Sequence, residues 1–126
     1  MYNEKVMDHF KHPRNVGEIE GADGVGTNGG IDCGDLLKVY VKVSNEKIED
    51  IKFQIAGCPA AIATSSMMTE LVKGKTIKEV LMLKDDDVVE ALGGLPEEKV
   101  HCSNLGLGAL KKALEDYSGK DNQEAV

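Results

Sequence analysis

The sequence predicts a fold that combines helices with an antiparallel β-hairpin. Apolar residues alternate with polar ones from Leu37 to Val43 and again from Ile51 to Ile55, which is typical of half-buried strands. Residues 44–47, Ser-Asn-Glu-Lys, supply the turn that joins the two strands. Ile48 is out of phase with the second strand, which predicts a β-bulge or a similar irregularity close to it.

Helices are predicted before and after this hairpin along the chain. Asn3 can cap a short helix that ends at about Lys11, just before a His-Pro pair. After the hairpin, Pro59 suits the first turn of a helix, because its missing N–H would be unpaired there. We expect that helix to run to Lys73 and to end at Gly74.

The second half of the chain predicts three further helices. Thr76 and Glu79 form a capping-box pattern at the start of the first. Acids at 85–87 begin the second, where the helix dipole stabilises them without any metal. Apolar residues at helical spacing from Leu105 to Tyr117 mark the third helix. Gly106 and Gly108 lie inside it and suggest close packing against a neighbour.

Two segments carry weaker signals. Residues 14–32 are rich in glycine and predict a long loop, with one weak edge strand between Val25 and Asp32. From about Ser118 the chain is polar and predicts a mobile tail. With 126 residues and no internal repeat, we expect a single domain over residues 1–126.

Composition excludes several classes of partner. The chain carries 15 Lys and Arg against 22 Asp and Glu, a net charge of −7, and only 4% aromatic residues. Nucleic-acid binding needs a basic face and base-stacking aromatics, so it is disfavoured. No apolar run reaches the roughly 18 residues of a membrane span, and the N-terminus lacks a signal-peptide pattern. We therefore expect a cytoplasmic protein that binds neither nucleic acid nor membrane.

Three cysteines, Cys33, Cys58 and Cys102, carry the first specific signal. An odd number in a reducing compartment does not suit a disulfide framework. Buried cysteines acting as small hydrophobic residues are the alternative. However, each of the three lies where an element begins or ends, which is where a scaffold presents chemistry. Cys58 precedes a predicted helix, whose positive end favours the thiolate.

Glycines lie beside two of these cysteines, and two other ligand types lie near them. Gly34 and Gly57 allow a close approach of the backbone. Asp35 follows Cys33 by two residues, and His101 directly precedes Cys102. Three thiolates with one carboxylate and one imidazole suit zinc or an iron–sulfur cluster. An incomplete set of cysteines suggests a cluster that can be released.

Ordered motifs across the chain resemble one known family, the iron–sulfur cluster assembly scaffold proteins IscU and the N-terminal domain of NifU. The resemblance covers residues 1 to about 117. The matching stretches, in chain order, are Met1–Phe10, Pro13–Gly17, Cys33–Asp35, Ile48–Asp50, Phe53, Gly57–Cys58, Ala61–Ala63, Ser65–Ser66, Val72–Lys75 and Lys99–Ser103.

This resemblance implies an α+β fold with a small three-stranded antiparallel sheet and helices packed against it. It also implies that Cys33, Cys58 and Cys102 accept sulfur and bind the cluster, with Asp35 and His101 as accessory ligands. We prefer Asp35 as the fourth ligand, because a neighbouring glycine lets its carboxylate turn toward a metal held by Cys33. His101 then exchanges with it.

The function implied is that of a scaffold and not of an enzyme. It would accept sulfur from a cysteine desulfurase, bind iron, assemble a transient [2Fe–2S] cluster and transfer it to apo-proteins. Zinc is the alternative metal of the cluster-free form. Ferredoxin, an iron donor and a second copy of the chain in a homodimer are further candidate partners. Residues 95–99 read Leu-Pro-Glu-Glu-Lys where the family has Leu-Pro-Pro-Val-Lys, which disfavours a heat-shock chaperone with an apolar groove.

Three other functions are weaker. A zinc-dependent sulfurtransferase of the SufU type would carry an insertion between its second and third cysteines and lack the histidine, and this chain shows neither feature. A thiol enzyme with Cys102 as nucleophile and His101 as base is disfavoured, because adjacent helical residues point about 100° apart. A structural zinc site is the remaining alternative.

Other potential ligands are predicted to have structural roles. His9 and His12 are expected on a solvated helix face. Met67, Met68 and Met82 are expected to fill the core.

Overall fold

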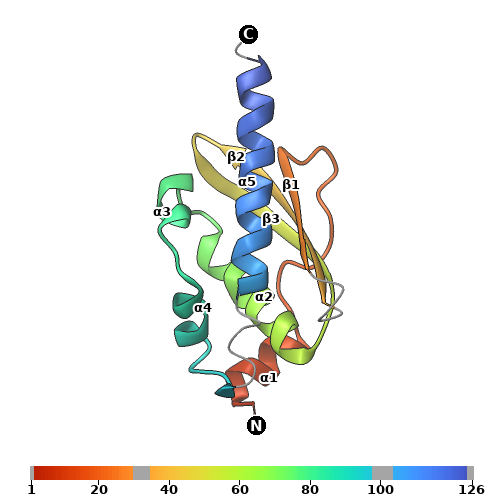
Figure 1. Ribbon diagram of the computed structural model, residues 1–126, viewed down its shortest axis with the longest axis vertical. Helices are drawn as coiled ribbons and strands as arrows, with labels where there is room; N and C mark the ends of the chain where they lie inside the picture. The colour runs from red at the N-terminus through yellow and green to blue at the C-terminus, as the bar shows by residue number, and fades with distance from the viewer. Residues whose placement is uncertain (1, 30–34, 98–103, 125–126) are drawn as a thin grey trace.

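A computed structural model of the protein describes residues 2–29, 35–97 and 104–124 (Figure 1). Its sheet has three antiparallel strands in the order β1-β2-β3, namely β1 (Gly24–Gly29), β2 (Leu36–Ser44) and β3 (Lys47–Ala56). The helices of the described ranges are α1 (Glu4–Lys11), α2 (Pro59–Val72), α3 (Ile77–Leu81), α4 (Asp85–Ala91) and α5 (Asn104–Glu124). The α+β class with a three-stranded antiparallel sheet is confirmed.

The hairpin forms as the alternating pattern predicts. Its strands pair from Leu36 opposite Ala56 to Ser44 opposite Lys47. Asn45 and Glu46 make the turn with φ angles of 53° and 62°, the left-handed conformation that two-residue hairpin turns need. The register shifts beside the pair formed by Val43 and Ile48, so the irregularity predicted near Ile48 is confirmed.

Strand β1 (Gly24–Gly29) lies at the edge of the sheet, so the edge strand predicted between Val25 and Asp32 is confirmed, with its start one residue earlier. It starts at Gly24 and pairs along β2 from Val41 to Leu36. Gly24 and Gly26 are buried under α5. A Cβ built on Gly26 would lie 2.2 Å from the carbonyl oxygen of Ala109. Strand and helix are therefore in backbone contact, which only residues without a side chain permit.

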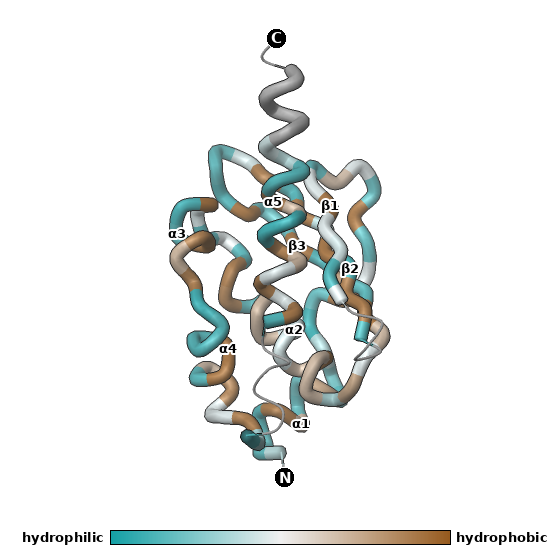
Figure 2. The backbone as a smooth tube through the Cα atoms, viewed as in Figure 1, coloured by the Kyte–Doolittle hydropathy of each residue, from teal (hydrophilic) through white to brown (hydrophobic). Residues whose placement is uncertain are grey.

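The core lies between one face of the sheet and helices α2 and α5 (Figure 1). Figure 2 shows apolar residues recurring along β2, β3 and α2. The largest fully buried side chains there are Phe53, Leu37, Ile48, Ile51, Met68 and Leu110. A smaller cluster of Val6, Ala63 and Leu92 joins α1, α2 and the end of α4. The sheet and α2 thus share one core, which positions the ends of these elements relative to one another.

The predicted helix boundaries are largely confirmed. Asn3 accepts a hydrogen bond from the amide of Val6 at the start of α1. Thr76 and Glu79 form the reciprocal capping box of α3. Gly74 has a φ of +85° just after α2, as expected of a glycine that ends a helix.

Helix α5 extends further than the apolar pattern indicates. It continues past Tyr117 to Glu124, and its end projects beyond the sheet (Figure 1). The helical backbone therefore enters the segment for which the sequence predicts a tail, while the mobility of that segment stays a prediction. Across the described residues, no helix combines the length and apolar character that crossing a bilayer requires.

Candidate functional site

The open end of the hairpin brings two predicted ligands together. Asp35 immediately precedes β2 and Cys58 follows β3 by two residues. Because Leu36 pairs with Ala56, the residues just outside that pair must lie side by side. The Oδ1 atom of Asp35 accepts a hydrogen bond from the backbone N–H of Cys58 at 3.1 Å. Both residues are partly exposed, so a partner or a metal can reach this end of the sheet.

Cys58 also begins helix α2. It is the N-cap residue, Pro59 occupies the first turn, and the side chain of Cys58 makes no capping hydrogen bond. The carboxylate of Asp35 supplies a negative charge at this helix end instead. That arrangement is favourable, because unpaired N–H groups and the helix dipole make a helix start electropositive.

The structure describes two of the five predicted ligands. It brings Asp35 and Cys58 into direct contact. Cys33, His101 and Cys102 lie outside the described residues, so their roles stay predictions. Within the described ranges, no three His, Cys, Asp or Glu side chains are grouped closely enough to hold a metal ion.

The prediction for His9 is wrong. Its side chain is buried, and its Nδ1 lies 2.8 Å from the hydroxyl of Ser66 on α2. The amide of Arg14 donates to the same hydroxyl oxygen at 2.9 Å, which leaves the hydroxyl hydrogen available to Nδ1 of a neutral ring. His9 therefore joins α1 to α2, whereas His12 is exposed as expected.

Burial lowers the pKa of His9, and the nearby charge of Arg14 lowers it further, against the opposing charges of Asp8 and Glu70. The neutral ring is the form that its hydrogen bond to Ser66 suits. Neither α1 nor this hydrogen bond takes part in the Asp35–Cys58 contact, so His9 has a structural role.

The methionine predictions are partly confirmed. Met68 is fully buried in the main core, and Met67 packs against it. Met82 is 73% exposed, so the prediction that it fills the core is wrong. It is the residue that ends α3.

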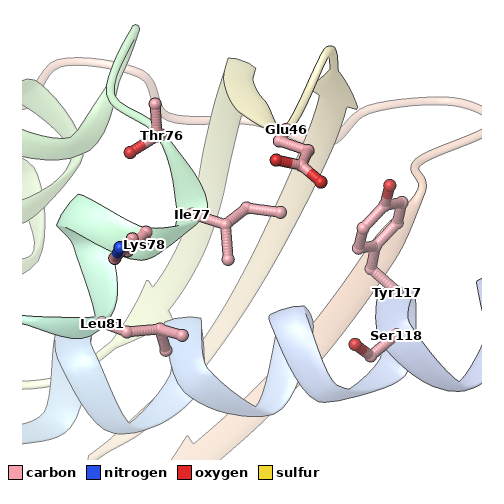
Figure 3. Close-up of a pocket in the computed structure, with 7 residues that line it drawn as sticks. All are labelled: Glu46, Thr76, Ile77, Lys78, Leu81, Tyr117 and Ser118. Carbon is pink, nitrogen blue, oxygen red and sulfur yellow. The ribbon is translucent and has the colours of Figure 1, made fainter.

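A cavity of about 370 Å³ lies away from the Asp35–Cys58 contact, at the other end of the hairpin. Figure 3 shows it between α3, the β2–β3 turn and α5. Its lining residues are Glu46, Thr76, Ile77, Lys78, Leu81, Tyr117 and Ser118. Glu46 is in the turn at the closed end of the hairpin, whereas Asp35 and Cys58 are at the open end. The lining holds no cysteine or histidine, so this cavity is not the site that the motifs indicate.

The family follows from a comparison with family models. The model described as the NifU-like N terminal domain matches residues 1–124. This chain belongs to the NifU-like N-terminal domain family. The family assignment made from the motifs is therefore confirmed over nearly the whole chain.

Individual members of the NifU-like family agree with this assignment. "Iron-sulfur cluster assembly scaffold protein IscU 1" of Archaeoglobus fulgidus is 61% identical over 123 residues, which cover 98% of this chain and 80% of that protein. The scaffold protein IscU of Aquifex aeolicus is 52% identical, with 97% and 79% covered. A crystal structure from Fervidobacterium islandicum, described as a putative iron–sulfur cluster assembly scaffold protein for the SUF system, has a TM-score of 0.74 at 29% identity and covers 90% of this chain and 96% of that one.

Proposed function

We propose that this protein is a scaffold on which an iron–sulfur cluster is assembled and from which it is passed to other proteins. The observation that carries the proposal is the contact between Asp35 and Cys58, which places a carboxylate beside a cysteine at an accessible helix start. The relatives named as cluster assembly scaffolds support the same function. The protein itself makes no catalytic turnover in this proposal, and it acts in the cytoplasm, where its cysteines remain thiols.

In this proposal Cys33, Cys58 and Cys102 hold the cargo, and Asp35 and His101 compete for the remaining position. Thiolates are the ligands that iron–sulfur clusters select, and a carboxylate is a harder and more weakly held ligand. Asp35 is fixed beside Cys58 by its hydrogen bond to the amide. We propose Asp35 as the fourth ligand of the bound cluster, with His101 replacing it during release.

Sulfur arrives by attack of a cysteine thiolate on the outer sulfur of a persulfide held by a cysteine desulfurase. The S–S bond of the desulfurase breaks, its own thiolate leaves, and the persulfide is now on the scaffold. Each such sulfur needs two electrons to become sulfide. Oxidation of the two irons of a [2Fe–2S] cluster from ferrous to ferric provides half of the electrons for its two sulfides. A ferredoxin would provide the others.

A zinc-dependent persulfide sulfurtransferase of the SufU type is the second candidate. The structural similarity to a SUF-system protein bears on this candidate, although that protein is described as a cluster assembly scaffold and not as a sulfurtransferase. The short interval between Cys58 and Cys102 and the presence of His101 favour the scaffold. Zinc is compatible with both functions, because three thiolates and one further ligand also make a tetrahedral zinc site.

The test is anaerobic reconstitution with ferrous iron, cysteine, a cysteine desulfurase and reduced ferredoxin, followed by the visible absorption spectrum and by iron and sulfide analysis. We expect equal amounts of iron and acid-labile sulfide in the parent protein and almost none in Cys58→Ser. Tightly bound zinc without any sulfide would support the sulfurtransferase. A cluster that forms unchanged in Cys58→Ser would refute the proposed site.

Cluster transfer to an apo-ferredoxin tests the role of Asp35. We expect Asp35→Ala to release its cluster more slowly, because the weakly held ligand is gone and His101 occupies its position. Asp86→Ala is the matched control, since Asp86 is an exposed acid of the first turn of α4. If Asp35→Ala transfers its cluster at the parental rate and only His101→Ala changes that rate, the assignment of the two ligands is reversed.

Docking to the desulfurase should depend on salt. The chain carries a net charge of −7, so we expect a few complementary charges to contribute to the complex and to be screened as ionic strength rises. Titration calorimetry between 50 and 500 mM salt, on the order of a threefold change in Debye length, measures this effect. An affinity independent of salt would exclude electrostatic docking.

A further inference from the structure

Gly57 separates β3 from Cys58, and its backbone conformation does not require glycine. Its φ angle lies outside the left-handed region, unlike those of Gly74 and Gly93. A residue with a side chain could adopt the same backbone. The effect of a side chain at this position therefore depends on the space that it would fill.

That space is occupied by the carboxylate of Asp35. A Cβ atom built on Gly57 would lie 2.8 Å from Oδ1 of Asp35 and 3.1 Å from its Cγ. Oδ1 is the atom that accepts the hydrogen bond from the amide of Cys58. A Cβ atom at position 57 would force the carboxylate of Asp35 to shift, because 2.8 Å is shorter than the van der Waals separation of carbon and oxygen. That shift would weaken or break the hydrogen bond to Cys58.

The third neighbour of that Cβ limits how the clash could be relieved. The Cβ of Ala61, in the first turn of α2, would lie 3.3 Å away. Ala61 is fully buried in the main core, so α2 cannot easily move. The short, partly exposed side chain of Asp35 is the group that would rotate away. A side chain at position 57 would thus displace the carboxylate and leave the fold intact.

We propose that Gly57 is a positioning residue for the metal ligand Asp35. By leaving room for the carboxylate, it lets the Cys58 amide hold Oδ1, so that Oδ2 remains available to a metal at the start of α2. This inference rests on the proposed function, in which Asp35 and Cys58 are ligands. Hydrogen bonds that orient a metal ligand typically change metal affinity 10- to 100-fold.

The experiment measures the affinity of the full chain for Zn²⁺ alone, by competition with a chromophoric chelator. The comparison is made in a His101→Ala background, so that the imidazole cannot take the position that Asp35 leaves. There we expect Gly57→Ala to bind Zn²⁺ about 10-fold more weakly than His101→Ala alone, and Asp35→Ala to bind it at least as weakly. The double variant should bind no more weakly than Asp35→Ala, because the carboxylate that the new methyl group displaces is already absent. Independent effects that multiply in the double variant would overturn the proposal.

A second readout needs no metal. The backbone N–H of Cys58 should exchange with solvent more slowly, and resonate further downfield, while it donates to Asp35. We expect NMR of the metal-free protein to show that this signature is lost in Gly57→Ala and in Asp35→Ala. It should persist in Asp35→Asn, whose amide oxygen still accepts the bond but is a poorer ligand. An unchanged Cys58 amide in Gly57→Ala would also overturn the proposal.

The matched control is Gly21→Ala. A Cβ at Gly21 meets no atom within 4 Å, but its φ of +70° disfavours alanine. That variant should lose some stability and keep the parental Zn²⁺ affinity, which separates positioning from general destabilisation. If Asp35→Ala keeps parental affinity, the ligand assignment in the proposed function fails and the positioning role with it. If Gly57→Ala keeps the parental Zn²⁺ affinity while Asp35→Ala loses affinity, only the positioning role is refuted.

Discussion

Replacing Gly26 by alanine is the most direct test of how the sheet and α5 pack. The new Cβ would lie 2.2 Å from the carbonyl oxygen of Ala109 and 2.3 Å from the backbone nitrogen of Ala113. Both neighbours are backbone atoms of a helix, so neither can rotate away. Relief to an ordinary contact distance requires α5 to move outward by more than about 1 Å.

The cost of that movement can be estimated from the core that α5 covers. A gap of about 1 Å forfeits up to half of the dispersion energy of the contacts it opens. Ala109, Leu110 and Ala113 are fully buried in that layer. Overpacking of a close-packed core costs about 1–3 kcal/mol, and we expect the upper end, about 3 kcal/mol. With a typical urea m-value of about 2 kcal/mol/M, the unfolding midpoint should fall by roughly 1.5 M.

Urea denaturation followed by far-UV circular dichroism measures this midpoint, and Gly106→Ala is its matched control. The three atoms nearest to a Cβ on Gly106 would all belong to the flexible side chain of Met68, at 3.4–3.6 Å. Alanine is favoured over glycine within a helix by about 1 kcal/mol, so this variant should be more stable than the parent. A parental midpoint for Gly26→Ala would refute the backbone contact between β1 and α5.

Three further outcomes follow from the described contacts. Ser66→Ala removes the hydroxyl that joins His9 and the Arg14 amide, and it should lower the free energy of unfolding by about 2 kcal/mol. Urea titration measures this loss. Its control is Ser65→Ala, because the buried hydroxyl of Ser65 has no hydrogen-bond partner among the described residues. Because burial lowers the pKa of His9 below 6.5, the folded state binds fewer protons than the unfolded state. Stability should therefore decrease as pH falls below about 6.5, and thermal unfolding of His9→Gln between pH 7 and 5 should show a shallower decrease; equal slopes would contradict this. Thr76→Ala breaks the capping box of α3 and should cost about 1 kcal/mol, with Thr76→Ser close to the parent in the same assay.

Much of the fold could be predicted because its signals are local. Alternation from Leu37 to Val43 reports which strand face is buried, and the caps at Asn3 and Thr76 act within one helical turn. Strand β1 gave only a weak signal, because Gly24 and Gly26 contribute no side-chain pattern. Its regularity depends on α5, which lies more than 80 residues away along the chain.

The same division holds for the candidate site. The sequence alone determined the residue types, the family and the position of Cys58 at a helix start, since thiols at element boundaries and a proline at a first turn are local features. The contact of Asp35 with the amide of Cys58 was decided by strand register. The burial of His9 was decided by Ser66, 57 residues away. Such contacts have no local signature, because they exist only after distant segments have packed against one another.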